Sequence, residues 1–122
     1  MNNQPMAADN VPHTYDAPAD YDNPLADPLP EISAAECDEI IRQAILVYGH
    51  EHQIHKLFEE MAELQNALCK LPHGRATADD VCEEIADVMI MCLQMANIYS
   101  EKRVEFWANL KMHRLKARLQ QL

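Results

Sequence analysis

Two pairs of acidic residues have the spacing that sets carboxylates side by side on a helix. The pairs are Glu60 with Glu63 and Glu84 with Asp87. Side chains three residues apart on a helix project together, and each pair borders the apolar stripe of a segment with helical periodicity. Two antiparallel helices that pack through these stripes would therefore bring four carboxylates together.

Four converging carboxylates repel one another, and some would protonate unless a cation neutralised them. A site with only oxygen ligands favours Mg²⁺, with Mn²⁺ as a possible substitute, over zinc. Magnesium usually binds substrate phosphates as well, which is how an acidic protein can hold a polyphosphate. Glu59 or Glu63 is then a candidate to orient a metal-bound water or accept its proton.

Other metal chemistries fit the residues less well. A carboxylate-bridged di-iron bundle needs Glu-x-x-His pairs, and the chain has none. His50, His52 and His55 cluster before the first acidic pair, but no HxxxH or CxxC supplies the further ligands of a zinc site. We expect these histidines to be exposed polar residues, with His55 near the mouth of the carboxylate site.

Four predicted helices position these groups. They run from Ser33 to about Tyr48, from about Glu51 to Leu71, from Thr77 to about Tyr99 and from Ser100 to about Leu119. Ser and Thr precede three of them as N-caps, and Gly or Pro-His-Gly ends the first two. Because the connections are short, consecutive helices should be antiparallel neighbours. The sequence predicts an all-α domain, a four-helix bundle, over residues 31–122.

The third predicted helix indicates assembly. From Ile85 to Ile98 it is apolar nearly all round, so it must be covered on every side. Three short neighbours in a small domain cannot cover it. We expect a homodimer at least, or a homotetramer built as a dimer of dimers.

Residues 1–30 differ in composition from the rest. They hold six of the seven prolines and five aspartates, with no Lys or Arg. A segment of this kind buries too little apolar surface to offset its chain entropy, so we predict a disordered acidic arm.

Charge and hydropathy exclude several classes of protein. The chain has 122 residues and a net charge of −10, which disfavours general binding to nucleic acids or anionic membranes. We find no apolar run of membrane-spanning length and no secretory signal. The four cysteines form no CxxC pair and should be reduced. We therefore expect a cytoplasmic protein with no membrane or nucleic-acid partner.

The acidic pairs belong to a longer pattern. EExxE at residues 59–63 is followed after twenty residues by ExxD at residues 84–87. This resembles the signature of the all-α nucleoside triphosphate pyrophosphohydrolases of the MazG-like branch. Residues 49–56 look like the lead-in of small, phage-type members, and Asn109 to Arg114 reads N-x-K-x-x-R, like a late element of the family. The resemblance covers roughly residues 40–118, and the acidic arm has no counterpart in it.

The resemblance implies Mg²⁺-dependent hydrolysis of a (deoxy)nucleoside triphosphate to the monophosphate and pyrophosphate, in nucleotide-pool housekeeping. It implies a set of metal ligands made of Glu60, Glu63, Glu84 and Asp87. It also implies a set of triphosphate-binding residues made of Lys56, Lys111 and Arg114, with Asn109 assisting. The alternative is a non-enzymatic helical dimer that acts as an adaptor or nucleotide-binding module. The sequence does not fix the preferred nucleotide, the phosphorus that is attacked or the residues of a base pocket.

Overall fold

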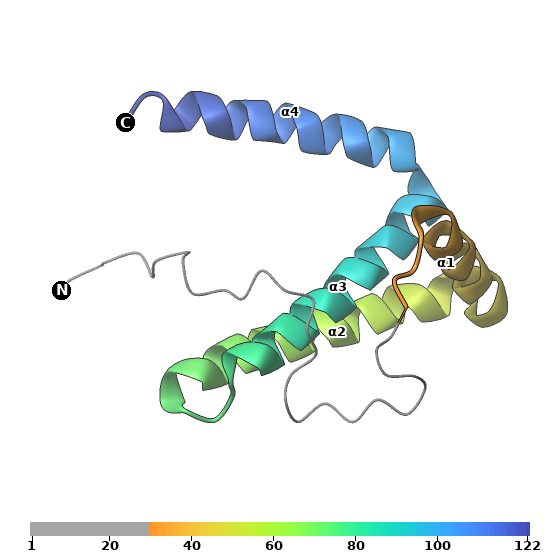
Figure 1. The fold of residues 1–122 in the computed structure, drawn as a ribbon, viewed down its shortest axis with the longest axis horizontal. Helices are drawn as coiled ribbons and strands as arrows, with labels where there is room; N and C mark the ends of the chain where they lie inside the picture. Colours follow the sequence, from red (N-terminus) through yellow and green to blue (C-terminus); the bar gives the residue numbers. More distant parts are fainter. Residues whose placement is uncertain (1–29) are drawn as a thin grey trace. The chain divides into compact units, whose positions relative to one another are not determined.

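The computed structural model describes residues 30–122, which are almost entirely helical (Figure 1). The elements are α1 (Ala34–Tyr48), α2 (His50–Lys70), the single 3₁₀ turn η2 (Leu71–His73), α3 (Ala78–Tyr99) and α4 (Glu101–Leu119). The predicted all-α class is confirmed for these residues, and the predicted helix ends are met to within a residue or two. The predicted disorder of residues 1–30 lies outside the described residues, apart from Pro30.

Local chemistry sets the helix boundaries. The backbone N–H of Glu36 donates to Ser33 Oγ at the start of α1. Gly49, with φ of 85°, is the only residue between α1 and α2, and a positive φ of this size is inexpensive only for glycine. At the start of α3 the Asp80 N–H donates to Thr77 Oγ1 (3.1 Å) and the Thr77 N–H donates to Asp80 Oδ2 (2.7 Å). These two bonds complete a capping box. Hydrogen bonds from the backbone N–H and then the side chain of Thr77 to the Asp80 carboxylate lower the pKa of Asp80.

Helices α2 and α3 form an antiparallel hairpin that turns at η2 (Figure 1). Pro72 lies in that turn, and Gly74 takes up a left-handed conformation directly after it. Helix α1 packs across the open end of the hairpin. The buried apolar residues of the described chain come from these three helices; they are Ile41, Ile45, Ala67, Val81 and Met91.

A buried polar pair ties the two hairpin helices together. The Gln53 side-chain amide on α2 donates to Gln94 Oε1 on α3, and both residues are buried. Since each amide partly satisfies the other, the pair avoids much of the cost of burying unpaired polar groups. It also fixes the position of α2 along α3, because sliding either helix would separate the two amides.

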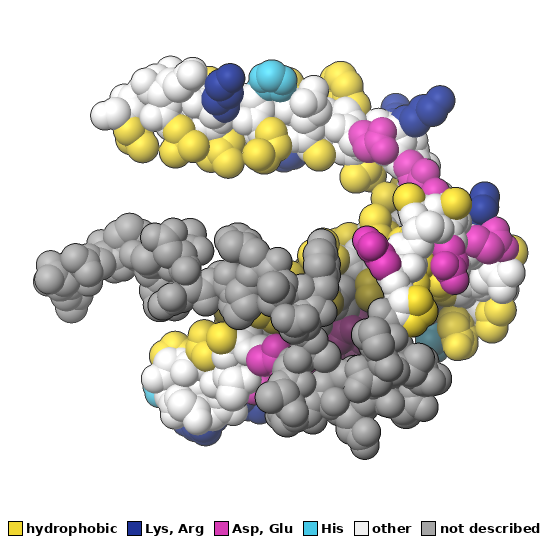
Figure 2. Space-filling model, viewed as in Figure 1, with side chains coloured by type: hydrophobic (Ala, Val, Ile, Leu, Met, Phe, Trp, Pro, Cys, Tyr) yellow, Lys and Arg dark blue, Asp and Glu magenta, His cyan; other side chains and the backbone are white. Residues whose placement is uncertain are grey.

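Helix α4 contributes nothing to this core. None of its residues is buried, and all of them except Leu110 are exposed. Figure 2 shows its hydrophobic side chains in a row along one side of the helix. Residues 30–122 thus build a core from three helices, and the predicted four-helix bundle is formed only in part because the apolar side of α4 has no partner among these residues.

Helix α3 also leaves apolar surface uncovered. Ile85, Met89, Ile90 and Leu93 are each exposed by 42–61%, as expected for a helix that is apolar nearly all round. No helix among the described residues is long and apolar enough to cross a membrane.

Candidate metal centre

Three of the four predicted carboxylates meet at the middle of the α2–α3 hairpin. Carboxylate oxygens of Glu60 on α2 and of Glu84 and Asp87 on α3 all lie within 4.8 Å of one another. The carboxylates converge because antiparallel packing of α2 and α3 through their apolar stripes places the two acidic pairs at the same position along the hairpin. The predicted convergence is therefore observed for these three residues.

The cluster leaves buried oxygens without partners. Glu60 is only 7% exposed, and neither Glu60 Oε2 nor Glu84 Oε2 has a hydrogen-bond partner. A buried polar atom without a partner is destabilising, whereas an oxygen that coordinates a cation has one. Both unpartnered oxygens belong to the cluster, and all its donor atoms are carboxylate oxygens. The residues present thus fit a hard divalent cation such as Mg²⁺.

The electrostatic surroundings of Glu84 also favour a bound cation. Burial, followed by the charges of Glu63, Asp87, Glu83 and Glu60, raises the pKa of the Glu84 carboxyl. A raised carboxyl pKa means that the surroundings disfavour the ionised form. The cluster therefore carries more negative charge than its own surroundings neutralise.

Lys56 neutralises part of that charge. Its Nζ lies 3.0 Å from Glu60 Oε1 and 3.2 Å from Glu59 Oε2, and bonds to these two carboxylates raise the pKa of the Lys56 ammonium. The sequence resemblance implied that Lys56 binds phosphate, but in this structure it is the ion-pair partner of Glu60. Glu59 lies on the outer side of Lys56 with 65% of its side chain exposed.

Glu63 lies outside the group of three but close to it, because its charge raises the pKa of Glu84. It lines a polar cavity of about 210 Å³ that also includes Glu84. Lys70 at the end of α2 and Arg75 in the turn before α3 line the same cavity. Neither base forms an ion pair among the described residues.

The sequence analysis did not identify Lys70 and Arg75 as site residues. The signal was present, since both bases lie near the turn of a hairpin whose two arms carry the acidic pairs. Only the helical register of α2 and the path of the turn show that they share a cavity with Glu63 and Glu84.

The predicted residues of α4 are not joined to the cluster. Asn109, Lys111 and Arg114 are exposed on α4, and no hydrogen bond or ion pair among the described residues links them to the carboxylates. Lys111 and Arg114 do line one hollow together with Arg118, as their spacing predicts. The full predicted set of phosphate-binding residues is therefore not assembled within the described part of one chain.

The histidines lie beside the site on the exposed part of α2. His52 and His55 line a hollow with Lys56 and Glu59. The ring of His52 stacks on Tyr48 with centroids 5.8 Å apart, and His55 meets Phe58 edge-on at 6.0 Å. The acidic cluster found in the described chain includes no histidine, so these rings border the site without joining its ligands.

Comparisons of the chain with protein-family models, curated proteins and solved structures give no match. The geometry of the site and the sequence pattern are therefore the grounds for a functional proposal.

Proposed function

We propose that the chain is a magnesium-dependent hydrolase that cleaves a (deoxy)nucleoside triphosphate to the monophosphate and pyrophosphate. The observation that carries this proposal is the convergence of Glu60, Glu84 and Asp87, with two buried carboxylate oxygens left unpartnered. These residues also occupy the acidic positions of the EExxE and ExxD pattern. A role in nucleotide-pool housekeeping rests on that resemblance alone.

Each acidic residue has a distinct part in this proposal. Glu60, Glu84 and Asp87 would hold the metal ion, which when bound neutralises phosphate oxygens and lowers the pKa of a coordinated water. We assign Glu63 the role of accepting a proton from the attacking water, because it is exposed and its charge acts on Glu84. Glu59 is less suited to that role, because its carboxylate already pairs with Lys56.

The bases around the cluster divide into two groups. Lys56 forms an ion pair with Glu60, so its positive charge offsets part of the negative charge of the acidic cluster. Lys70 and Arg75, which line the cavity beside Glu63 and Glu84, supply cations for the outer phosphate groups. Such cations offset charge that develops on a leaving pyrophosphate.

The direct test is pyrophosphate release from a panel of ribo- and deoxynucleoside triphosphates, with and without Mg²⁺, alongside Asp87→Ala. We expect metal-dependent release that this substitution abolishes. Folded protein that releases no pyrophosphate from any of these nucleotides would refute the proposal and favour the non-enzymatic adaptor or nucleotide-binding module.

Replacing both cavity bases, as in Lys70→Gln with Arg75→Gln, should raise KM for the triphosphate about tenfold, because each lost charged contact is worth about 0.5–1 kcal/mol at an exposed site. Since the metal cluster is untouched, kcat should change much less. Steady-state kinetics provide the measurement. Arg42→Gln is the matched control, because Arg42 pairs with Glu39 on the exposed side of α1. Equal effects of the control and the double variant would contradict the assignment.

A further inference from the structure

Helix α4 has an apolar side that no other described helix of its chain covers. Its large apolar residues Val104, Trp107, Met112, Leu115 and Leu119 are 41–64% exposed. In proteins most of the stability of a helix comes from packing its apolar face against a partner rather than from intrinsic helix propensity. The exposed row in Figure 2 is therefore a surface that requires a cover.

Both acids of α4 lie near its start. Residues 101–105 hold Glu101 and Glu105 together with Lys102 and Arg103, whereas residues 106–122 contain four bases and no acid. These bases are Lys111, Arg114, Lys116 and Arg118. We call residues 106–119 the basic half of α4. Its complement must be a surface that is both apolar and acidic.

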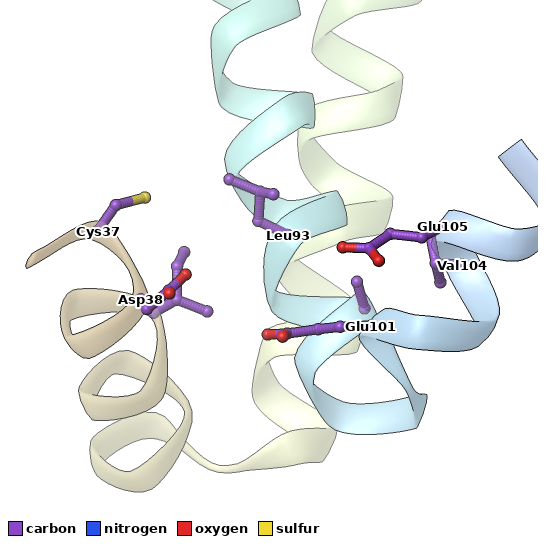
Figure 3. Close-up of a pocket in the computed structure, with 8 residues that line it drawn as sticks. Cys37, Asp38, Leu93, Glu101, Val104 and Glu105 are labelled. Atoms are coloured by element: carbon purple, nitrogen blue, oxygen red, sulfur yellow. The ribbon is translucent and has the colours of Figure 1, made fainter. Parts of the chain in front are cut away.

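One such surface lies at the other end of the same helix. A groove of about 230 Å³ between α1, α3 and the start of α4 has Ile41, Leu93 and Val104 among its apolar lining. Its acidic lining is Asp38, Glu101 and Glu105. Figure 3 shows Asp38 on α1 and the two glutamates on α4, with Leu93 of α3 between them. We call this the acidic groove.

The basic half cannot reach the acidic groove of its own chain. The groove residues Glu101 and Glu105 belong to the same continuous helix as the basic half, and at 1.5 Å per residue Arg118 is about 25 Å along the axis from Glu101. The N-terminal residues 1–30 are a poor occupant, because they carry five aspartates and no base and the groove would repel them. A second copy running in the opposite direction has neither difficulty.

We infer that the chain forms a two-fold symmetric dimer in which the basic half of α4 of each copy packs into the acidic groove of the other. A two-fold axis makes this contact twice, so each copy gives one helix and receives one. The exposed α3 residues Ile85, Met89 and Leu93 follow at intervals of four, so they share a helix face that leads away from the groove. This face extends the apolar surface available to the partner helix.

Charge reversal on each side of the contact tests this dimer. A groove variant carries Asp38→Lys and Glu105→Lys, and a helix variant carries Lys116→Glu and Arg118→Glu. Each variant alone places like charges in both contacts and should weaken the dimer at least about tenfold. In a 1:1 mixture of the two variants, the mixed dimer pairs opposite charges in both contacts, so the dimer should be restored.

The measurement is molar mass by light scattering over a dilution series, with circular dichroism to show that each variant is helical. Wild type should have twice the chain mass of 13.9 kDa. Lys102→Glu, on α4 but outside the basic half, is the control and should remain dimeric. A monomeric wild type, unaffected single variants, or a mixture that stays as dissociated as its components would overturn the inference. Because the readout is mass, it does not depend on catalytic activity.

Discussion

Glu84→Gln is expected to reduce Mg²⁺-dependent pyrophosphate release by at least about 100-fold, because it removes a charged metal ligand. The same substitution should raise the thermal stability of the metal-free protein. Burial and four neighbouring carboxylates disfavour the ionised form of Glu84, and a neutral amide of the same shape removes that repulsion. A residue that limits stability while it supports activity is characteristic of a functional site.

The two effects are measured on the same preparation, by pyrophosphate release and by thermal melts in EDTA and in Mg²⁺. Glu51→Gln is the control, because Glu51 is exposed near the start of α2 and lies outside the cluster. It should leave both the activity and the Mg²⁺-dependent rise in Tm intact. If Glu84→Gln retained the activity, or lowered the Tm of the metal-free protein, the cluster would not be the metal centre.

The parts of this protein that could be predicted from sequence are those set by short-range rules. Caps such as Ser33 and Thr77 fix helix ends through contacts three residues away. The i, i+3 spacing of Glu84 and Asp87, together with a tight turn between α2 and α3, was sufficient to place both opposite Glu60. Glu63 was predicted as an equal member, but it lies toward the exposed side of α2 and lines the neighbouring cavity instead.

The features that sequence did not reveal depend on long-range register. The buried Gln53–Gln94 pair spans 41 positions, and nothing local indicates that either amide lies in the core. The ion pair of Lys56 with Glu60 follows from their i, i+4 spacing. The burial of Glu60 makes this pair part of the candidate site, and that burial depends on how α2 packs on α3. The placement of α4 could not be derived, because its apolar side has no partner within the described chain.

The affinity of the chain for Mg²⁺ is expected to rise with pH across the range in which Glu84 loses its proton. The pKa of Glu84 is raised above its ordinary value of 4.5, so the metal-free folded chain binds this proton more tightly than the unfolded chain does. The resulting stabilisation is fully present below about pH 4.5 and is lost as the pH rises through the raised pKa. A metal ion must displace the same proton, so below that pKa its apparent affinity falls by up to about tenfold per pH unit.

The measurement is the Mg²⁺-induced rise in Tm between about pH 5 and pH 7, at constant ionic strength. It should be smaller at the acidic end for wild type. Asp80 and Glu39 have lowered pKa values, so their contributions to stability are lost as the pH falls through those values, opposite in sign to Glu84. Comparing melts with and without Mg²⁺ at each pH cancels these contributions, because neither residue is in the cluster. A Mg²⁺ effect that is the same at both ends of the range would show that the ion binds without displacing the Glu84 proton, and therefore that it binds elsewhere.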